Sequence, residues 1–340
     1  MLTLTTPTHL QKNSKINNIE PSIQKHISEV ELLAEKCGGT ATRLSGLKDL
    51  IQELPKLGKV RAVISNPYAI QGQTIQYKET KLWDNQGSIQ GSNTCLCLLL
   101  NHWHYGFAIQ DWDSNGKFSY SLQFFDRDGV GVYKIHLTTK SNQYTYKSLV
   151  IRHRSSDQTP RQSISPLPRK IHPHQDEITS PQLQQCWQEL QDLQDLPSIF
   201  HYFGVDQLKG LQIAGTDFAV PITVYGLQYL LNLLQETKLP VVFRTYNQGA
   251  VQTYQGEVQY CAATGGCVTI LDTYFSLRMR SLKETKLWII RKFKGSNEMA
   301  VISLYDRYGT PVFQISSQNG YGRTAKKIWQ QLLTTLEKKV

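Results

Sequence analysis

Two pairs of side chains with metal-binding or redox chemistry alternate along neighbouring segments of the sequence. Cys95 and Cys97 are separated by one residue, and so are His102 and His104. On an extended strand, residues spaced in this way project from the same face. Two imidazoles are a weak indication of zinc, because a structural zinc ion takes four ligands and no further ligand accompanies these two. Two small thiols on one face are typical of core packing, so neither pair by itself assigns a reaction.

The usual signatures of nucleotide-binding proteins and hydrolases are missing from the sequence. No GxGxxG follows a predicted strand, and no GxxxxGK, GxSxG or HExxH occurs. Gly265 and Gly266 join two strand-like segments instead of opening a helix. The six cysteines form no CxxC pair, which is typical of reduced thiols. The sequence therefore offers no starting point for a phosphate-binding loop, a nucleophile elbow or a zinc protease.

The overall charge favours an anionic partner. The chain of 340 residues carries a net charge of +10, with a pI near 9.2. Nucleic acid, a membrane surface and a small ligand with carboxylates all suit that sign. The basic residues are scattered along the chain, whereas nucleic-acid binding usually concentrates them on one face, so a nucleic-acid partner is disfavoured. No run approaches the ~18 apolar residues of a membrane helix, and the sequence predicts a cytoplasmic protein without membrane insertion.

The elements that must position these residues occur twice. Residues 124–135 read FFDRDGVGVYKI and residues 304–315 read LYDRYGTPVFQI, so Asp-Arg-x-Gly recurs at the same place in two predicted hairpins. The aspartate can accept hydrogen bonds from its own turn and the glycine supplies a positive φ, which favours a structural role for the motif. Residues 95–111 also align with residues 275–291 without a gap. The sequence therefore predicts an internal duplication.

Each half of the chain has the pattern of helices followed by a run of strands. This order predicts an α+β protein in which two large antiparallel sheets pack together with flanking helices. The predicted domains are residues 1–153 and 183–340, joined by a proline-rich linker at 154–182. Helical periodicity predicts helices at 28–36, 47–54, 182–195, 198–210, 221–237 and 323–338.

Several segments resemble one protein family along most of the chain. They are GLKDLIQELPKLGKVRAVISNPYAI (46–70), LLLNHW (98–103), SLQFFDRDGVGVYKIHLT (121–138), FGVDQLKGLQIAG (203–215), VVFRTYNQGAVQTYQGEV (241–258), KLWIIRK (286–292) and SLYDRYGTPVFQI (303–315). In this order, and with its duplication, the chain resembles the bacterial haemin-degrading factor, or cytoplasmic haem-trafficking, family of the HemS/ChuS type. The resemblance implies haem in a cleft between the halves, and a haem importer or a haem oxygenase as protein partners.

The resemblance also places candidate haem contacts on particular residues. The family's axial histidine falls on Gln194, a poor iron ligand, and the nearest histidine is His201. A family arginine on the opposite side of the haem falls on Cys97. Phe243 matches an aromatic residue that lines the cleft, and Lys292 matches a family lysine. Two of these positions, Gln194 and Cys97, therefore depart from the family pattern.

The predicted site combines these residues with Arg278, which lies on an adjacent predicted strand. His201 is the expected iron ligand, and Lys292 and Arg278 are the expected partners of the haem propionates. Two other interpretations stay open: iron could be bound by a side chain of the other half, or the cleft could hold another tetrapyrrole or nothing. The candidates from the other half are Cys97, His102 and His104. The predicted haem-binding residues are His201, Gln194, Phe243, Arg278, Lys292 and Cys97.

The sequence thus predicts a cytoplasmic protein that binds haem, or a related tetrapyrrole, and passes it on. The first alternative is a haem-degrading monooxygenase that releases iron and a linear tetrapyrrole. It needs an open iron face and a distal hydrogen-bond donor, and Cys97 in place of the family arginine argues against it. The second alternative is a basic nucleic-acid-binding or regulatory protein, whose binding would weaken steeply with salt. The sequence does not decide whether the chain is an enzyme.

Overall fold

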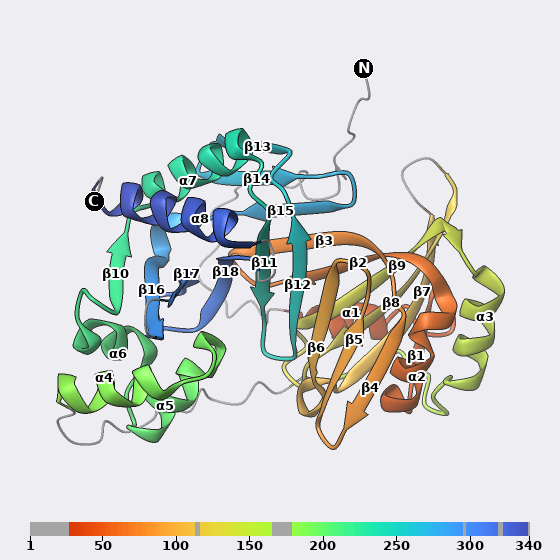
Figure 1. The fold of residues 1–340 in the computed structure, drawn as a ribbon. Helices are drawn as coiled ribbons and strands as arrows, with labels where there is room; N and C mark the ends of the chain where they lie inside the picture. Colours follow the sequence, from red (N-terminus) through yellow and green to blue (C-terminus); the bar gives the residue numbers. More distant parts are fainter. Residues whose placement is uncertain (1–26, 113–115, 165–178, 295–296, 319–321, 339–340) are drawn as a thin grey trace, which may run out of the picture.

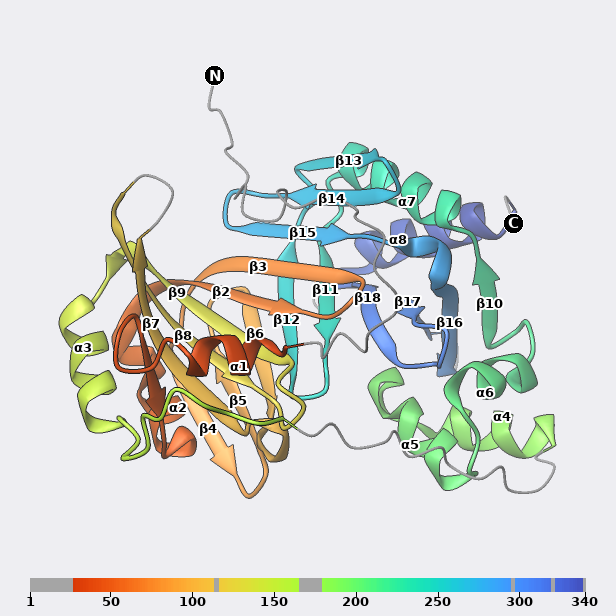
Figure 2. The ribbon, with the colours of Figure 1, turned by 180° about the vertical axis from the view of Figure 1, so that it is seen from behind.

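The protein consists of two large β-sheets with helices packed around them (Figure 1 and Figure 2). The computed structural model describes residues 27–112, 116–164, 179–294, 297–318 and 322–338. Each sheet has nine strands, and neighbouring strands within it are antiparallel. The predicted α+β class with two large antiparallel sheets is confirmed.

The two sheets are called sheet A and sheet B. Sheet A has the strand order β1 (Ala41–Leu44), β7 (Tyr105–Trp112), β8 (Phe118–Phe125), β9 (Gly131–Ser141), β2 (Gly58–Ser65), β3 (Ala69–Gln76), β15 (Phe275–Met279), β14 (Cys267–Leu271) and β13 (Tyr260–Thr264). Sheet B has the strand order β10 (Ala219–Ile222), β16 (Lys286–Lys294), β17 (Asn297–Tyr305), β18 (Pro311–Ser317), β11 (Val241–Tyr246), β12 (Ala250–Gly256), β6 (Thr94–Leu99), β5 (Gln86–Gln90) and β4 (Glu79–Trp83).

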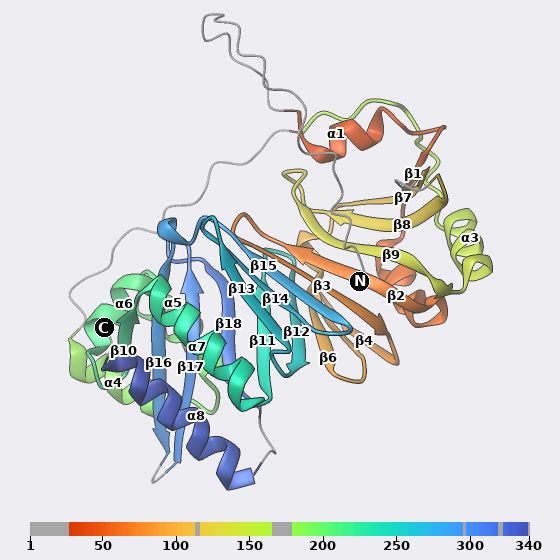
Figure 3. The same cartoon turned by 90° about the horizontal axis from the view of Figure 1, so that it is seen from above.

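The helices flank the sheets at both ends of the molecule (Figure 3). The α-helices are α1 (Glu29–Ala34), α2 (Leu47–Glu53), α3 (Gln143–Arg152), α4 (Ser180–Glu189), α5 (Leu196–Tyr202), α6 (Gln207–Ala214), α7 (Val224–Thr237) and α8 (Gly322–Glu337). Short 3-10 helices are η2 (Leu54–Leu57), η3 (Leu100–His102), η4 (Leu193–Asp195) and η5 (Leu282–Glu284).

Each sheet is completed by three strands from the other half of the chain. Strands β4, β5 and β6 extend sheet B through the pairing of β6 with β12. Strands β13, β14 and β15 extend sheet A through the pairing of β15 with β3. The internal duplication is therefore built with an exchange of strands, so each nine-stranded sheet contains strands of both halves. The linker prediction falls partly on residues 165–178, which lie outside the described residues.

Two equivalent asparagines hold the halves against each other. The side-chain amide of Asn66 donates to the carbonyl oxygens of Tyr246 and Val312, and its Oδ1 accepts from backbone N–H groups of its own turn. Asn247 repeats this pattern, because its amide donates to the carbonyl oxygens of Ser65 and Val132. The Oδ1 of each asparagine therefore accepts hydrogen bonds from its own turn, and its amide donates hydrogen bonds to carbonyl oxygens of the opposite half.

The repeated Asp-Arg-x-Gly motif forms the same hairpin turn in each half. Asp126 Oδ1 accepts from the N–H groups of residues 128 and 130, and Asp306 Oδ1 accepts from those of residues 308 and 310, at 2.8–3.0 Å. Gly129 and Gly309 have φ angles of 76° and 82°, which glycine adopts at little cost. The structural interpretation of the motif agrees with these contacts.

The inner face of each sheet is covered by helices and by strands of the other half. Helices α2 and α3 pack on sheet A together with β5 and β6, whose Leu96 and Leu98 are buried. Helices α7 and α8 pack on sheet B together with β14 and β15. Because side chains alternate along a strand, Cys95 and Cys97 project from the opposite, outer face of β6. Other helices pack on the outer faces: α1 on sheet A and α4–α6 on sheet B.

The predicted helices differ from the observed ones mainly around α4 to α6. The helix predicted at 182–195 ends at Glu189, and the one predicted at 198–210 is divided between α5 and α6. Asp192 and Asp206 are the cause, since each accepts a backbone N–H two or three residues ahead and begins a new helix. Helix α3 has no predicted counterpart, because it buries only Tyr146 and Leu149 and its apolar periodicity is weak.

Candidate functional site

The outer face of sheet B carries a row of polar side chains across five neighbouring strands. Residues paired in adjacent strands project to the same side of a sheet. Adjacent strands lie about 4.8 Å apart, so four of these strands, from β18 to β6, span about 14 Å. The polar row, as we call it, consists of Ser303, Gln314, Arg244, Thr253 and Cys95, each paired with the next.

Helices α4, α5 and α6 cover one end of this face. Phe200 of α5 packs in one apolar cluster with Trp288 of β16 and Tyr305 of β17. The carboxylate of Asp192, at the start of η4, acts electrostatically on the Tyr246 hydroxyl, so the connection between α4 and α5 lies near β11. Beyond the helices, Arg244 and Thr253 are half-buried and Cys97 is exposed. The face is thus helix-covered at β16 and β17 and accessible toward β6.

Cys95 and Cys97 form a hydrogen-bonded pair of thiols at the accessible end. Their Sγ atoms are 4.0 Å apart, and Cys95 Sγ also accepts from Gln90 Nε2 at 3.2 Å. The hydrogen bond from Cys95, with the positive charge of Arg244, lowers the pKa of Cys97 to about 7, whereas that same hydrogen bond and burial raise the pKa of Cys95. Cys97 is therefore available as a thiolate near neutral pH, with Cys95 as the protonated donor.

Arg244 places a cationic group in the middle of the polar row. Its Nη1 donates to Ser316 Oγ at 2.9 Å and to Gln314 Oε1 at 3.3 Å. Both partners are neutral oxygens, and in the described part of the chain no carboxylate lies within ion-pair distance of this guanidinium. The charge of Arg244 is thus available to an anionic ligand on this face.

Two further polar groups on this face are wholly or partly buried, Trp288 and Tyr246. Burial raises the pKa of Tyr246 to about 12, so its hydroxyl stays protonated and donates to Gln314 Oε1 at 3.3 Å. The indole Nε1 of Trp288, which pairs with Ser303 across β16 and β17, has no hydrogen-bond partner among the described residues. Buried donors nearly always have a partner in native proteins, so this N–H is a position that a bound molecule or a water would complete.

Four of the six predicted site residues lie on this face or on its helical cover. Cys97 is on β6 beside the polar row, and Lys292 is on β16 and only 2% exposed. Gln194 and His201 are exposed and belong to η4 and α5. Lys292 pairs with Met299, a residue that packs against the α4–α6 cluster, so it lies under the helices rather than at the accessible end.

The other two predicted residues lie elsewhere. Phe243 is 0% exposed on the inner face of sheet B, where its ring stacks on Phe275 and Phe313. Arg278 is exposed on β15, which belongs to sheet A and pairs with β3 and β14. Phe243 therefore contributes to the core, and Arg278 does not share a face with Cys97.

Sequence reasoning missed Arg244, which the structure places at the centre of the row. It lies next to Phe243 in the segment VVFRTY, and alternation along a strand puts neighbours on opposite faces. The arginine amid the apolar residues of that segment was the available signal. Cys95 and Cys97 were expected as small core residues, and the exposure of Cys97 corrects that interpretation.

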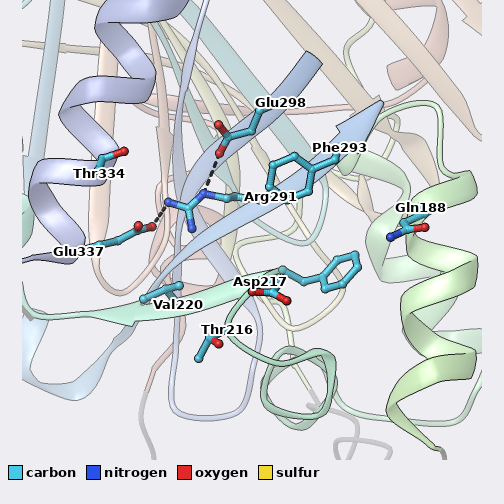
Figure 4. A pocket seen from close by; sticks show the side chains of 10 residues that line it. Gln188, Thr216, Asp217, Val220, Arg291, Phe293, Glu298, Thr334 and Glu337 are labelled. Carbon is cyan, nitrogen blue, oxygen red and sulfur yellow. Dashed lines mark ion pairs between the residues drawn. The ribbon is translucent and has the colours of Figure 1, made fainter. Parts of the chain in front are cut away.

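Another cavity lies away from this face, where α8 meets β10 and β16 (Figure 4). Its volume is about 580 Å³, and Arg291 is its central cation. Arg291 Nε pairs with Glu298 at 2.7 Å and Nη2 pairs with Glu337, so two carboxylates neutralise the guanidinium (Figure 4). The cavity contains none of the predicted site residues, and these ion pairs join α8 to sheet B.

Two negative observations apply to the residues that the structure describes. Within those residues, no three His, Cys, Asp or Glu side chains come together in a metal-binding group. In the same part of the chain, no helix is long and apolar enough to cross a membrane.

Comparison with known proteins gives matches over most of the chain. The family described as the haemin-degrading HemS/ChuX domain matches residues 26–153 and 204–336. The hemin transport protein HmuS of Yersinia pestis is 24% identical over 314 residues, which is 91% of this chain and 90% of that protein. The hemin transport protein HemS of Yersinia enterocolitica is 24% identical over 317 residues, covering 92% and 90%.

Solved structures share the fold. PhuS of Pseudomonas aeruginosa, a heme-binding protein in its holo form, has a TM-score of 0.84 at 24% identity, over 90% of this chain and 89% of that one. ChuS of E. coli, a heme oxygenase, has a TM-score of 0.80 at 21% identity, over 91% and 92%. The chain thus shares its two-sheet fold with these solved proteins. The chain is a member of the haemin-degrading HemS/ChuX family.

Proposed function

We propose that this protein binds haem on the outer face of sheet B, at the accessible strands beside α4 and α5, and carries it within the cytoplasm. The observation that carries the proposal is the set of groups on this face and its cover: a thiol of lowered pKa, an arginine with no carboxylate partner among the described residues, and a helix bearing His201. Membership of the haemin-degrading HemS/ChuX family supports haem as the ligand.

The residues on this face fit the chemistry of haem. Imidazole and thiolate are both axial ligands of haem iron in proteins, whereas the amide of Gln194 is not a usual one. The accessible strands β18 to β6 span about 14 Å, which suits a flat macrocycle. Arg244 suits a propionate, because a guanidinium binds carboxylates through charge-assisted hydrogen bonds. Haem is the cargo here, and the chain's own residues bind it, orient it and exclude water from it.

His201 is the ligand proposed from the helical side. It lies one residue beyond Phe200, which packs into the cluster on β16 and β17 and thereby fixes α5 over sheet B. Its side chain is exposed, so it is not part of the core. Lys292 and Arg278, the propionate partners expected from the sequence, are replaced in this proposal by Arg244.

The protein partners follow from the cargo. A haem importer would supply haem, and a haem oxygenase would receive it. The net charge of +10 favours capture of a ligand with two carboxylates. Release to an acceptor needs an accessible edge, which the strands beyond the α4–α6 cover provide.

A haemin titration of the purified protein tests the proposal. We expect a saturable Soret band at one haem per chain, and weaker binding with an altered band in His201→Ala. Absence of a saturable band in the wild-type protein would contradict haem binding. Adding ascorbate in air then separates carriage from degradation: an intact Soret band supports a carrier, and bleaching with release of iron would assign haem degradation instead.

A further inference from the structure

The pair of cysteines on β6 is placed for ligand chemistry rather than for packing. The residues between and after them, Leu96 and Leu98, are each 1% exposed in the inner core, so the two thiols stand on the opposite face. Cys97 is the exposed one of the six cysteines, all of which lie in described residues. Neither thiol therefore has a role in the core.

A disulfide is not the state that this geometry favours. The two Sγ atoms are 4.0 Å apart, about twice the length of a disulfide bond. Residues two apart on one strand have Cα atoms about 6.6 Å apart, near the upper end of the disulfide range. The pair is instead joined by a hydrogen bond, with Gln90 donating to Cys95 from the neighbouring strand.

The surroundings favour an anion at the sulfur of Cys97. The guanidinium of Arg244 lies two strands away on the same face and acts electrostatically on this sulfur. Cys95 Sγ accepts from Gln90 Nε2 and lies 4.0 Å from the sulfur of Cys97, so the Cys95 S–H can donate to that sulfur. One hydrogen-bond donor and one cation thus lie on the same face as the exposed Cys97, as suits a thiolate ligand.

We propose that Cys97 is a thiolate ligand of haem iron, reached from the sheet side of the site, and that Cys95 is a positioning residue that donates a hydrogen bond to that thiolate. The inference rests on the proposed haem site. Ligation forms one iron–sulfur bond, releases the Cys97 proton to solvent if the thiol was protonated, and involves no change of oxidation state. A hydrogen bond to the sulfur withdraws electron density from it and so tunes the iron.

Spectroscopy of the haem-loaded protein tests this assignment. The variants are Cys97→Ser and Cys95→Ala, with Cys267→Ser, half-buried on β14 of sheet A, as the matched control. We expect a thiolate signature in wild type and in Cys267→Ser: a strongly red-shifted Soret band of the ferrous carbonyl form, and a low-spin ferric electron paramagnetic resonance spectrum of the thiolate type. Cys97→Ser loses this signature, and Cys95→Ala keeps the thiolate with a shifted band and binding weaker by about tenfold.

Two different results would contradict thiolate ligation and haem binding. Saturable haem binding with the same spectrum in wild type and Cys97→Ser would overturn thiolate ligation and leave haem binding intact. A wild-type protein that gives no saturable Soret band would overturn both. Because Cys97 is exposed, Cys97→Ser is expected to keep the fold, and its unchanged circular dichroism serves as the check.

Discussion

At the scale of single residues, the site is defined by how strand alternation divides neighbours between two faces. Phe243 and Arg244 are adjacent in sequence, yet one stacks in the core and the other lies in the polar row. The sequence predicts Phe243 as a haem contact, and the structure places its ring in the core; Arg244 is the neighbour that lies on the proposed site. Which face of β11 is the outer one depends on what packs on each side, and a single sequence does not reveal that.

The first prediction concerns the ionisation of Cys97. The pKa of this thiol is lowered to about 7, chiefly by the hydrogen bond from Cys95, so alkylation by iodoacetamide should rise with a midpoint near that pH. Removing the donor in Cys95→Ala should raise the pKa and move the midpoint to higher pH. Arg244→Gln should move it in the same direction, because a positive charge favours the thiolate.

Peptide mapping by mass spectrometry isolates Cys97 from the other five cysteines. Cys267→Ser is the control, since Cys267 lies in sheet A and its loss should leave the midpoint unchanged. A midpoint at the ordinary thiol value in wild type, or one that neither variant shifts, would contradict the thiol–thiolate pair.

At the scale of elements, the repeated turns and the helix starts account for most of what the sequence could predict. Both Asp-Arg-x-Gly motifs were predicted as hairpin turns, because the residues that make the turn are the motif itself. Helix α3 was not predicted, because its position depends on the tertiary packing of Tyr146 and Leu149 rather than on a strong local sequence pattern.

The second prediction is that the two turn aspartates stabilise the fold equally. Each carboxylate accepts two backbone N–H groups, so Asp126→Ala and Asp306→Ala should each lower the free energy of unfolding by roughly 1–3 kcal/mol. Chemical denaturation measures the change. Arg127→Ala, an exposed neighbour in the first turn, should stay within about 0.5 kcal/mol of wild type. A large loss in one half only would contradict structural equivalence of the turns.

The third prediction is a pH dependence at the contact between α2 and α3. Desolvation opposes ionisation of Glu53, but hydrogen bonds from Arg152, Lys56 and His153 outweigh it and lower the pKa of Glu53 from 4.5 to about 2. Because the folded pKa is below the unfolded one, this contribution to stability is complete above about pH 4.5 and is lost as the pH falls toward 2.

Denaturation curves between pH 2 and 6 measure this loss. Glu53→Gln removes the titrating group, so the difference in unfolding free energy between wild type and variant should shrink as the pH falls through this window. A difference that stays constant with pH would exclude Glu53 as the group responsible.

At the scale of the whole molecule, the duplication was evident from the sequence and the exchange of strands was not. The segments β4–β6 and β13–β15 are equivalent, so each could pair with the sheet of its own half or with that of the other. The local sequence pattern of these strands is the same whether they pair with the sheet of their own half or with that of the other half. The choice is made by long-range strand pairing, of β6 with β12 and of β15 with β3.

The fourth prediction follows from this exchange. A specific protease site placed within residues 165–178 would divide the chain into two fragments that each contribute three strands to the other's sheet. We expect the fragments to co-elute in size-exclusion chromatography under native conditions and to separate only in denaturant. Separation without denaturant would contradict the exchanged topology.

The central claim is that haem binds on the outer face of sheet B, and blocking that face tests it most directly. Thr253 pairs with Arg244 on the outer face of sheet B, and Thr74 pairs with Arg61 in sheet A; both threonines are half-buried. Haemin titration should show binding at least about tenfold weaker in Thr253→Trp, a loss of roughly 1.4 kcal/mol, and wild-type binding in Thr74→Trp. Wild-type affinity in Thr253→Trp, or loss of binding only in Thr74→Trp, would contradict the account.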